Sequence, residues 1–207
     1  MNRIISMAIA LIMAVNVNAQ EGYEDTKHEV SIALGIEANS QWIDDFETGF
    51  TVLSGYRCEN EKYMEPISAE YFYHINKMLS LGAVFVYGNL KQDLYDSYSY
   101  SSYRTTSFRE RIGKSSNNYY TLLPTVKFNF LRKTHFGLYS KAALGATLRT
   151  ESVKYNDEYY DVSKKVLILN CQFSLIGVEA GSPYLRGFAE LGFGEQGVVC
   201  AGIRYKF

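Results

Sequence analysis

The sequence predicts an all-β protein, an eight-stranded antiparallel transmembrane β-barrel with meander topology, long extracellular loops and short periplasmic turns. Three observations lead to this prediction: an export signal, two-residue alternation of apolar and polar side chains, and connections that alternate between short and long. The composition agrees, because the 207 residues include 18 tyrosines and 12 phenylalanines but only 3 prolines. Aromatic residues are enriched in strands, whereas proline interrupts them.

The first 19 residues have the pattern of a secretory signal peptide. The basic Arg3 precedes an uncharged, mostly apolar run, and residues 17–19 form a V-x-A cleavage pattern. The run is too short for a transmembrane helix, which needs ~20 residues, and no cysteine lies near the cleavage pattern to carry a lipid anchor. We therefore expect cleavage after Ala19 and a single outer-membrane barrel domain over residues 20–207.

Two-residue alternation marks eight segments as strands. They are residues 29–38, 65–75, 79–90, 118–130, 135–149, 165–179, 184–194 and 198–207. The connections 76–78, 131–134 and 180–183 are tight, whereas 39–64, 91–117 and 150–164 are longer; only the hairpin at 194–197 breaks this order. Tight periplasmic turns opposite longer extracellular loops are typical of outer-membrane barrels. An even number of strands places both termini on the periplasmic side.

Each predicted strand has one apolar face and one polar or small face. In 118–130 the apolar face is Tyr120, Leu122, Pro124, Val126, Phe128 and Phe130. Alternation alone does not say which face is inside, and a soluble lipocalin-like barrel would turn the apolar face inward. Eight strands enclose only enough space for side chains or one small ligand, so rows of Phe, Tyr and Leu would overfill it. We therefore expect the polar face inside and the apolar face against lipid.

Aromatic side chains gather toward strand ends on this predicted outer face. They are Tyr71, Tyr73, Tyr87, Tyr120, Phe128, Phe130, Tyr205 and Phe207. Aromatic girdles of this kind mark the two membrane interfaces of a barrel. Because a polar strand edge is not tolerated in lipid, we also expect the last strand, ending at Phe207, to pair with the first.

Four stretches carry a resemblance to a known family: EPISAEYFYHINKMLSLGAVFVYG, LLPTVKFNFLRKTHFGLYSKAALGATL, LIGVEAG and GFAELGFGEQGVVCAGIRYKF. They resemble successive strands of the small outer-membrane β-barrel (porin-like) family of Gram-negative bacteria. The terminal Phe207, preceded by alternating apolar residues, also resembles the signal read by the barrel-assembly machinery. The resemblance implies an outer-membrane location, with lipids and lipopolysaccharide as neighbours, and it supplies no catalytic residue.

Charged residues on the predicted inner face form the first candidate site. They are Glu37, Glu70, Lys127, Lys141, Arg186, Glu190 and Arg204, with His74 and polar residues of 165–179 between them. One interpretation is a polar channel or ligand cavity, which would make the protein a small-solute pore. The other is a salt-bridged plug, because charges facing a narrow interior must be paired to offset their desolvation. The near balance of acids and bases favours the plug and a structural or surface-interaction role.

The glycine pattern G-x-G-x-x-G at Gly192–Gly197 is predicted to be a hairpin turn. A dinucleotide fingerprint needs a helix after it and an acidic residue further along, whereas this chain ends ten residues later in a strand. No cofactor is therefore expected. The net charge of −1 also gives no electrostatic footprint for nucleic acid.

Catalysis and metal binding find little support in the sequence. The 3 histidines, His28, His74 and His135, all fall near the predicted periplasmic side, and none lies in a long loop. No Cys/His spacing suggests a metal site. We expect no enzyme, although a lipid-modifying outer-membrane enzyme remains the second alternative. The 3 cysteines allow at most one disulfide; we expect Cys171 on the lipid face and Cys200 inside, so these two should not pair.

The segment 93–111 is the most distinctive loop. It alternates Tyr with Ser and includes Tyr95, Tyr98, Tyr100 and Tyr103. Tyr/Ser-rich surfaces bind well because Tyr offers a large contact area at low entropic cost, so these residues are a possible surface contact loop for an extracellular ligand. The simpler interpretation is that two strands run past the membrane as an exposed hairpin.

Overall fold

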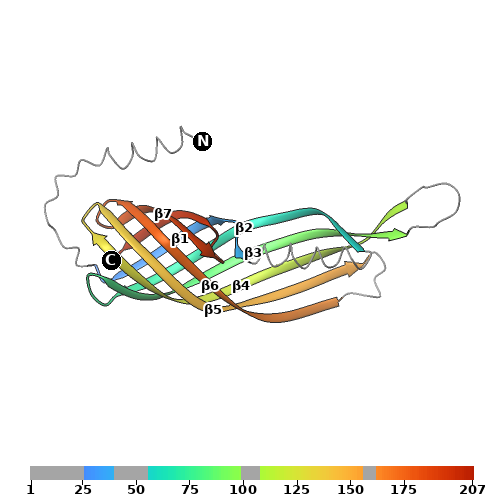
Figure 1. The fold of residues 1–207 in the computed structure, drawn as a ribbon, viewed down its shortest axis with the longest axis horizontal. Helices are drawn as coiled ribbons and strands as arrows, with labels where there is room; N and C mark the ends of the chain where they lie inside the picture. The colour runs from blue at the N-terminus through green and yellow to red at the C-terminus, as the bar shows by residue number, and fades with distance from the viewer. Residues whose placement is uncertain (1–25, 40–55, 99–107, 156–161) are drawn as a thin grey trace, which may run out of the picture.

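A computed structural model describes residues 26–39, 56–98, 108–155 and 162–207. In chain order the strands are β1 (His28–Ile36), β2 (Tyr56–His74), β3 (Leu79–Tyr98), β4 (Phe108–Arg132), β5 (Phe136–Tyr155), β6 (Val162–Gly181), β7 (Leu185–Gly194) and β8 (Val199–Lys206). Each strand is antiparallel to its sequence neighbours, and β1 also pairs with β8, so the sheet closes into a barrel (Figure 1). The predicted eight-stranded antiparallel barrel is confirmed.

The C-terminus takes part in this closure. The backbone N–H of Phe207 donates to the carbonyl oxygen of His28, and the N–H of His28 donates to the carbonyl oxygen of Phe207, each at 2.9 Å. The Phe207 ring also stacks on the His28 ring, with 5.4 Å between centroids. The predicted pairing of the last strand with the first is therefore confirmed.

The strands differ in length in a way that the sequence prediction missed. β1, β7 and β8 have 9, 10 and 8 residues, whereas β2 to β6 have 19 to 25. Pairing of β1 with β2 stops at Ile67, and pairing of β7 with β6 stops at Gln172. Beyond these residues β2 to β6 continue as an open, curved sheet (Figure 1), here called the sheet extension. It occupies much of what was predicted as long loops.

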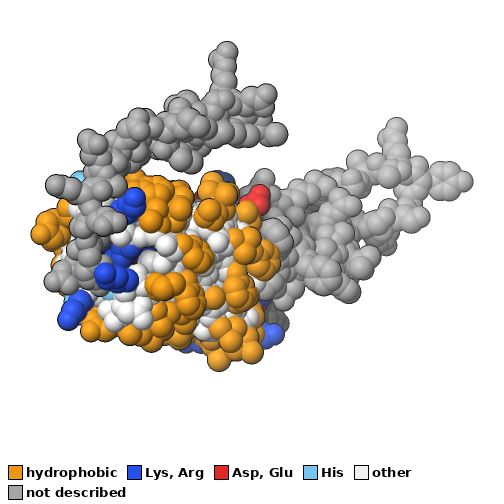
Figure 2. All heavy atoms as spheres, turned by 60° about the vertical axis from the view of Figure 1, so that its left-hand side comes forward, with side chains coloured by type: hydrophobic (Ala, Val, Ile, Leu, Met, Phe, Trp, Pro, Cys, Tyr) orange, Lys and Arg blue, Asp and Glu red, His pale blue; other side chains and the backbone are white. Residues whose placement is uncertain are grey.

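The wall of the closed part is apolar outside. Many exposed hydrophobic side chains cover it, and Figure 2 shows them spread over the visible face of the barrel. Above the paired Tyr87 and Tyr120, whose ring centroids lie 5.3 Å apart, the next outward residues on the same strands are Asn89 and Asn118. At the opposite end, His28 contacts the rings of Tyr71 and Tyr73. Among the described residues, no helix is long and apolar enough to cross a membrane.

The predicted outward aromatic residues all lie on the outer face. Tyr71, Tyr73, Tyr120, Phe128, Phe130, Tyr205 and Phe207 are exposed, and Tyr87 is half-buried. The interior is mostly polar, but it also holds two small apolar clusters. They are Phe72, Val84, Val86, Leu123 and Ala143 on one side and Ala33, Phe188 and Cys200 on the other. Cys200 is thus inside, and Cys171 pairs with the exposed Leu144 in the outward row, so the two thiols lie on opposite faces as predicted.

Candidate functional site

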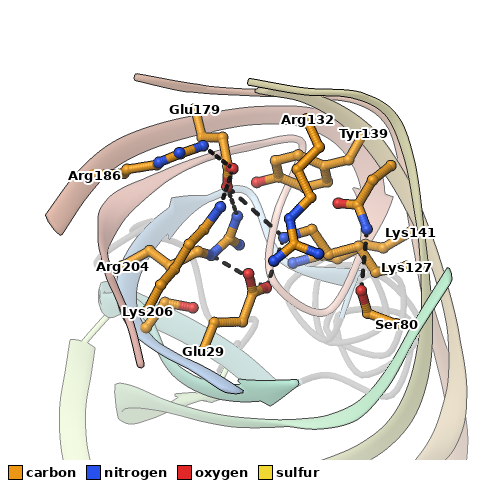
Figure 3. Close-up of polar contacts among 12 residues, drawn as sticks. Glu29, Ser80, Lys127, Arg132, Tyr139, Lys141, Glu179, Arg186, Arg204 and Lys206 are labelled. Carbon is orange, nitrogen blue, oxygen red and sulfur yellow. Dashed lines mark hydrogen bonds and ion pairs between the residues drawn. The ribbon is translucent and has the colours of Figure 1, made fainter. Parts of the chain in front are cut away.

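The lower part of the barrel interior is organised around Glu179 of β6. Arg186 and Lys206 donate to its Oε1 at 2.7 and 2.5 Å, and Arg204 donates to its Oε2 at 2.7 Å. The donors come from β7 and β8, and all four side chains are buried. Figure 3 shows them converging inside the wall. One carboxylate therefore accepts hydrogen bonds from three cations on the two strands that follow it in the chain.

Arg204 links this group to the rest of the interior. Its Nη2 donates to Glu70 at 3.1 Å, and its Nε lies 3.5 Å from Glu29. The guanidinium also lies over the rings of Tyr139 and Phe188, at 4.9 and 4.3 Å from their centroids. A planar guanidinium can donate in several directions within its plane while its flat face stacks on a ring, a geometry that the tetrahedral ammonium of lysine cannot reproduce.

A second group lies around Glu29 at the start of β1. Lys127 donates to Glu29 Oε1 at 2.6 Å, and His74 Nε2 lies 3.1 Å from Glu29 Oε2. His74 Nδ1 is 2.5 Å from Ser80 Oγ, which accepts a bond from Asn129 at 3.0 Å. Each member of this group thus has a partner on another strand.

A third group joins β5 to β2 and β7. Lys141 forms an ion pair with Glu70 and another with Glu190, the latter at 2.7 Å. Glu190 also accepts from Tyr139 and Ser174, each at 2.7 Å. Arg204 contacts a carboxylate of each group, namely Glu179, Glu29 and Glu70, so the three groups form one continuous network across the barrel.

Between this network and the sheet extension, the β7–β8 turn folds into the interior of the barrel. Glu195 accepts from Asn170 at 2.7 Å and from Thr121 at 3.2 Å. Gln196 donates to Ser68 and Glu70, both at 2.8 Å. Glu195 and Gln196 are 2% and 1% exposed, so the turn is a stopper rather than a surface loop.

Glycines permit this inward turn. Gly194 and Gly197 have φ values of 138° and 100°, which residues that carry a Cβ atom rarely adopt. A Cβ on Gly35 would overlap the carbonyl oxygen of Gln196, so the turn can lie against β1 only because that position lacks a side chain. The prediction that this glycine pattern is a hairpin turn is confirmed; its inward position was not predicted.

The interior charges balance. In the described part of the chain the buried acidic residues are Glu29, Glu70, Glu179, Glu190 and Glu195, and the buried basic residues are Lys127, Lys141, Arg186, Arg204 and Lys206. Five carboxylates therefore face five cations. Removing one partner of such a buried pair costs ~3–5 kcal/mol, because the survivor stays charged in a poorly solvated place. These charges come from β1, β2 and β4 to β8, so their contacts link seven strands and the β7–β8 turn across the interior.

The structure brings most of the predicted interior residues together. Glu70, Lys127, Lys141, Arg186, Glu190 and Arg204 are all buried in the network. Glu37 is a correction: it is exposed, just beyond the end of β1, with a φ of 58°. The prediction extended the alternation of β1 to residue 38, which would have put Glu37 on the inner face with Glu29. Instead, the left-handed backbone at Glu37 ends the strand, and the side chain points outward.

Among the charged network residues on strands, three were missed. Glu29 shares the parity of the inward residues of β1, so alternation could have identified it. Lys206 lies on the inward face of β8, two residues after Arg204. Glu179 has the wrong parity for the predicted inner face, because a bulge between Ser174 and Ile176 shifts the register of β6. No single-sequence pattern marks that bulge.

The tyrosine segment lies only partly within the described residues. Tyr95 and Tyr98 belong to β3, where they pair with Arg111 and Phe108 of β4. Strands thus continue here beyond the closed part, whereas the use of this segment as a surface contact loop stays a prediction. Tyr100 and Tyr103 lie outside the described residues. In the described ranges no group of three or more His, Cys, Asp or Glu side chains is arranged to hold a metal ion.

No protein-family model matches the chain, and no curated protein matches its sequence. Its fold is similar to crystal structures of Ail, the attachment invasion locus protein of Yersinia pestis. One, in complex with the heparin analogue sucrose octasulfate, is 14% identical with a TM-score of 0.42, over 87% of this chain and 99% of Ail. Another is 13% identical with a TM-score of 0.39, over 88% and 97%.

Proposed function

We propose that this chain is an integral outer-membrane β-barrel with a structural or cell-surface interaction role, in which a closed, salt-bridged barrel carries the sheet extension outside the cell. The observation that carries the proposal is the inversion of ordinary globular burial. Charges and hydrogen-bonding groups fill the inside, and leucines, isoleucines and aromatic residues cover the outside. A wall of this kind is stable only against lipid.

The filled interior favours a scaffold over a small-solute pore. The network around Glu179 and Glu70 crosses the lumen, and the Glu195–Gln196 stopper lies above it. An ion would have to displace buried pairs at two levels in succession. The protein therefore supplies a rigid, membrane-anchored platform, and no interior group is proposed as catalytic.

The proposed partners follow from the surface. Outer-membrane lipids and lipopolysaccharide contact the apolar wall and its aromatic borders, and the barrel-assembly machinery engages β8 through the terminal Phe207. No cofactor, metal ion or nucleic acid takes part. An extracellular ligand would bind to the sheet extension, which includes Tyr95 and Tyr98.

Two measurements test this proposal. The purified chain, refolded into bilayer nanodiscs, should migrate as a heat-modifiable band on gels, as compact membrane barrels do, and cell fractionation should place it in the outer membrane. In planar bilayers it should show no steady conducting state. A stable single-channel current would replace the scaffold with a pore, and altered lipopolysaccharide acyl chains in cells that carry the protein would indicate an enzyme.

A further inference from the structure

The sheet extension has two open edges, and they differ in character. The β2 edge, residues 56–66, has register shifts after Glu59 and after Met64 and ends at Pro66, which has no N–H to donate. Bulges, prolines and charges are the usual means by which natural sheets block pairing at an edge. The β6 edge, residues 162–171, has no proline, and its pairing with β5 is regular from Val162 to Ser174; its charges, Lys164 and Lys165, lie near the far end of the strand.

The backbone of the β6 edge is oriented for pairing. The carbonyl oxygen of Cys171 accepts from Glu195 N at 3.2 Å, so Cys171 directs its backbone groups away from β5. Because these groups alternate sides along a strand, Leu169, Leu167 and Lys165 direct theirs the same way. The β6–β7 ladder begins only at Gln172, and within the described ranges no backbone hydrogen bond continues it above Cys171.

The side chains of the β6 edge are unusually exposed for their type. Leu167 and Leu169 are 73% and 84% exposed. If the barrel spans the outer membrane as proposed, lipid does not account for them. Unpaired backbone groups are not tolerated in lipid, so this open edge must lie above the bilayer. An open backbone edge and an apolar row therefore coincide outside the membrane.

We infer that the β6 edge is a docking site for an extended strand of a protein partner, which adds to the sheet antiparallel to β6 and continues the line of β7. Strand addition gains affinity from backbone hydrogen bonds and specificity from alternate side chains. Here the partner presents apolar side chains opposite Leu169 and Leu167 and a carboxylate opposite the exposed Lys165. This inference rests on the proposed function for the orientation of the barrel.

A second copy of the chain fits this edge poorly. Two barrels in one membrane, related by a two-fold axis along the membrane normal, would bring their β6 strands together in parallel. Lys164 and Lys165 of both copies would then lie level with each other, and like charges facing across strands are destabilising. The acidic-apolar partner strand has no such conflict.

The test uses the full chain in nanodiscs, after its heat-modifiable band has shown that it is folded and inserted. The probe is a fluorescent seven-residue peptide with leucine, valine and glutamate at alternating positions, in that order, separated by threonine. Polarisation should report saturable binding, and amide hydrogen exchange should slow at Leu167 and Leu169. Two N-methylated peptides provide the matched control: methyl groups on the edge facing β6 should abolish binding, and those on the opposite edge should not.

Three variants test the site from the protein side. Leu167→Pro removes an N–H that faces the open edge and spares the β5–β6 ladder, so it should weaken peptide binding roughly tenfold. Leu167→Val keeps the N–H and should stay within about twofold of the parent. Lys165→Glu should weaken binding roughly threefold, and a peptide with lysine in place of glutamate should restore it.

Several outcomes overturn this inference. Binding that ignores which peptide edge is methylated, or that survives Leu167→Pro in a folded chain, excludes strand addition at β6. Absence of peptide binding combined with self-association through β6 assigns the edge to a second copy. If Leu167→Pro does not fold, the methylated peptides on the parent chain still decide. Failure to insert into nanodiscs refutes the proposed function, whereas insertion without binding refutes only this inference.

Discussion

The closed part of the barrel and the sheet extension use the same strands under opposite constraints. In the closed part, the interior charges are buried and each is held by partners from other strands; Glu179 alone contacts three cations within 2.7 Å. In the extension, the pair between Arg149 and Glu151 is longer, at 3.8 Å, and the Glu151 side chain is 34% exposed. An ion pair therefore contributes most to the free energy of unfolding where it is buried and water cannot take the place of either partner.

The largest expected effect is that of Glu179→Gln. The change leaves Arg186, Arg204 and Lys206 without their shared carboxylate, and such a loss costs ~3–5 kcal/mol. The unfolding midpoint of the refolded barrel in urea should fall accordingly, as read from its gel mobility. Glu151→Gln in the sheet extension is the matched control and should cost only ~0–1 kcal/mol. Equal effects of the two changes would show that water reaches the interior network.

The next effect concerns Glu190. Glu190→Gln should destabilise the barrel, because Lys141 loses a partner at 2.7 Å. Arg204 lies further away, at 3.8 Å. Adding Lys141→Gln should therefore recover more of the lost stability than adding Arg204→Gln, since Lys141 pairs with one further carboxylate, Glu70, whereas Arg204 contacts three. Thermal unfolding of the single and double variants gives a double-mutant cycle for each pair. A larger recovery of stability with Arg204→Gln than with Lys141→Gln would contradict the network described here.

A smaller effect is expected at the seam. Phe207→Asp removes the stacking on His28, worth ~0.5–1.5 kcal/mol, and places a charge at the barrel's outer border, which costs ~0–1 kcal/mol. Its yield in the outer membrane should fall further than its stability, because β8 is also the proposed assembly signal. Ser97→Asp in β3 is the control and should assemble at the parental level. Equal outer-membrane yields of the Phe207→Asp and Ser97→Asp variants would show that the terminal residue is not part of the assembly signal.

The smallest expected effect is at the stopper. Glu195→Gln keeps the shape of the side chain: its amide oxygen can still accept from Asn170, while its NH2 group donates to the Thr121 hydroxyl, so a charge-assisted bond is exchanged for neutral ones at a cost of ~1 kcal/mol. Conductance should stay at zero, because the network around Glu179 still fills the lumen. A steady current in this variant would mean that the turn alone seals the barrel.

The same contrast explains what the sequence could predict. Alternation is strong in the closed part, because one face meets apolar surroundings and the other faces inward, and there it identified all eight strands and most interior charges. In the sheet extension both faces carry polar residues, such as Ser116 on the outer face and Ser115 on the inner face, so residues 91–117, apart from their Tyr/Ser segment, showed no alternation of apolar with polar side chains and were expected to be loop. Within the closed part, prediction failed where the backbone departs from regular pairing, at the bulge before Glu179 and at the left-handed Glu37.

The inward β7–β8 turn has a consequence for assembly. Arg186 and Glu190 come from β7, Glu195 and Gln196 from the turn, and Arg204 and Lys206 from β8, so the last hairpin supplies a large share of the interior. Until it docks, Glu29, Glu70 and Glu179 lack many of their partners and must remain hydrated. Closing the wall and expelling water from the lumen are thus a single step, which docking of the β7–β8 hairpin completes.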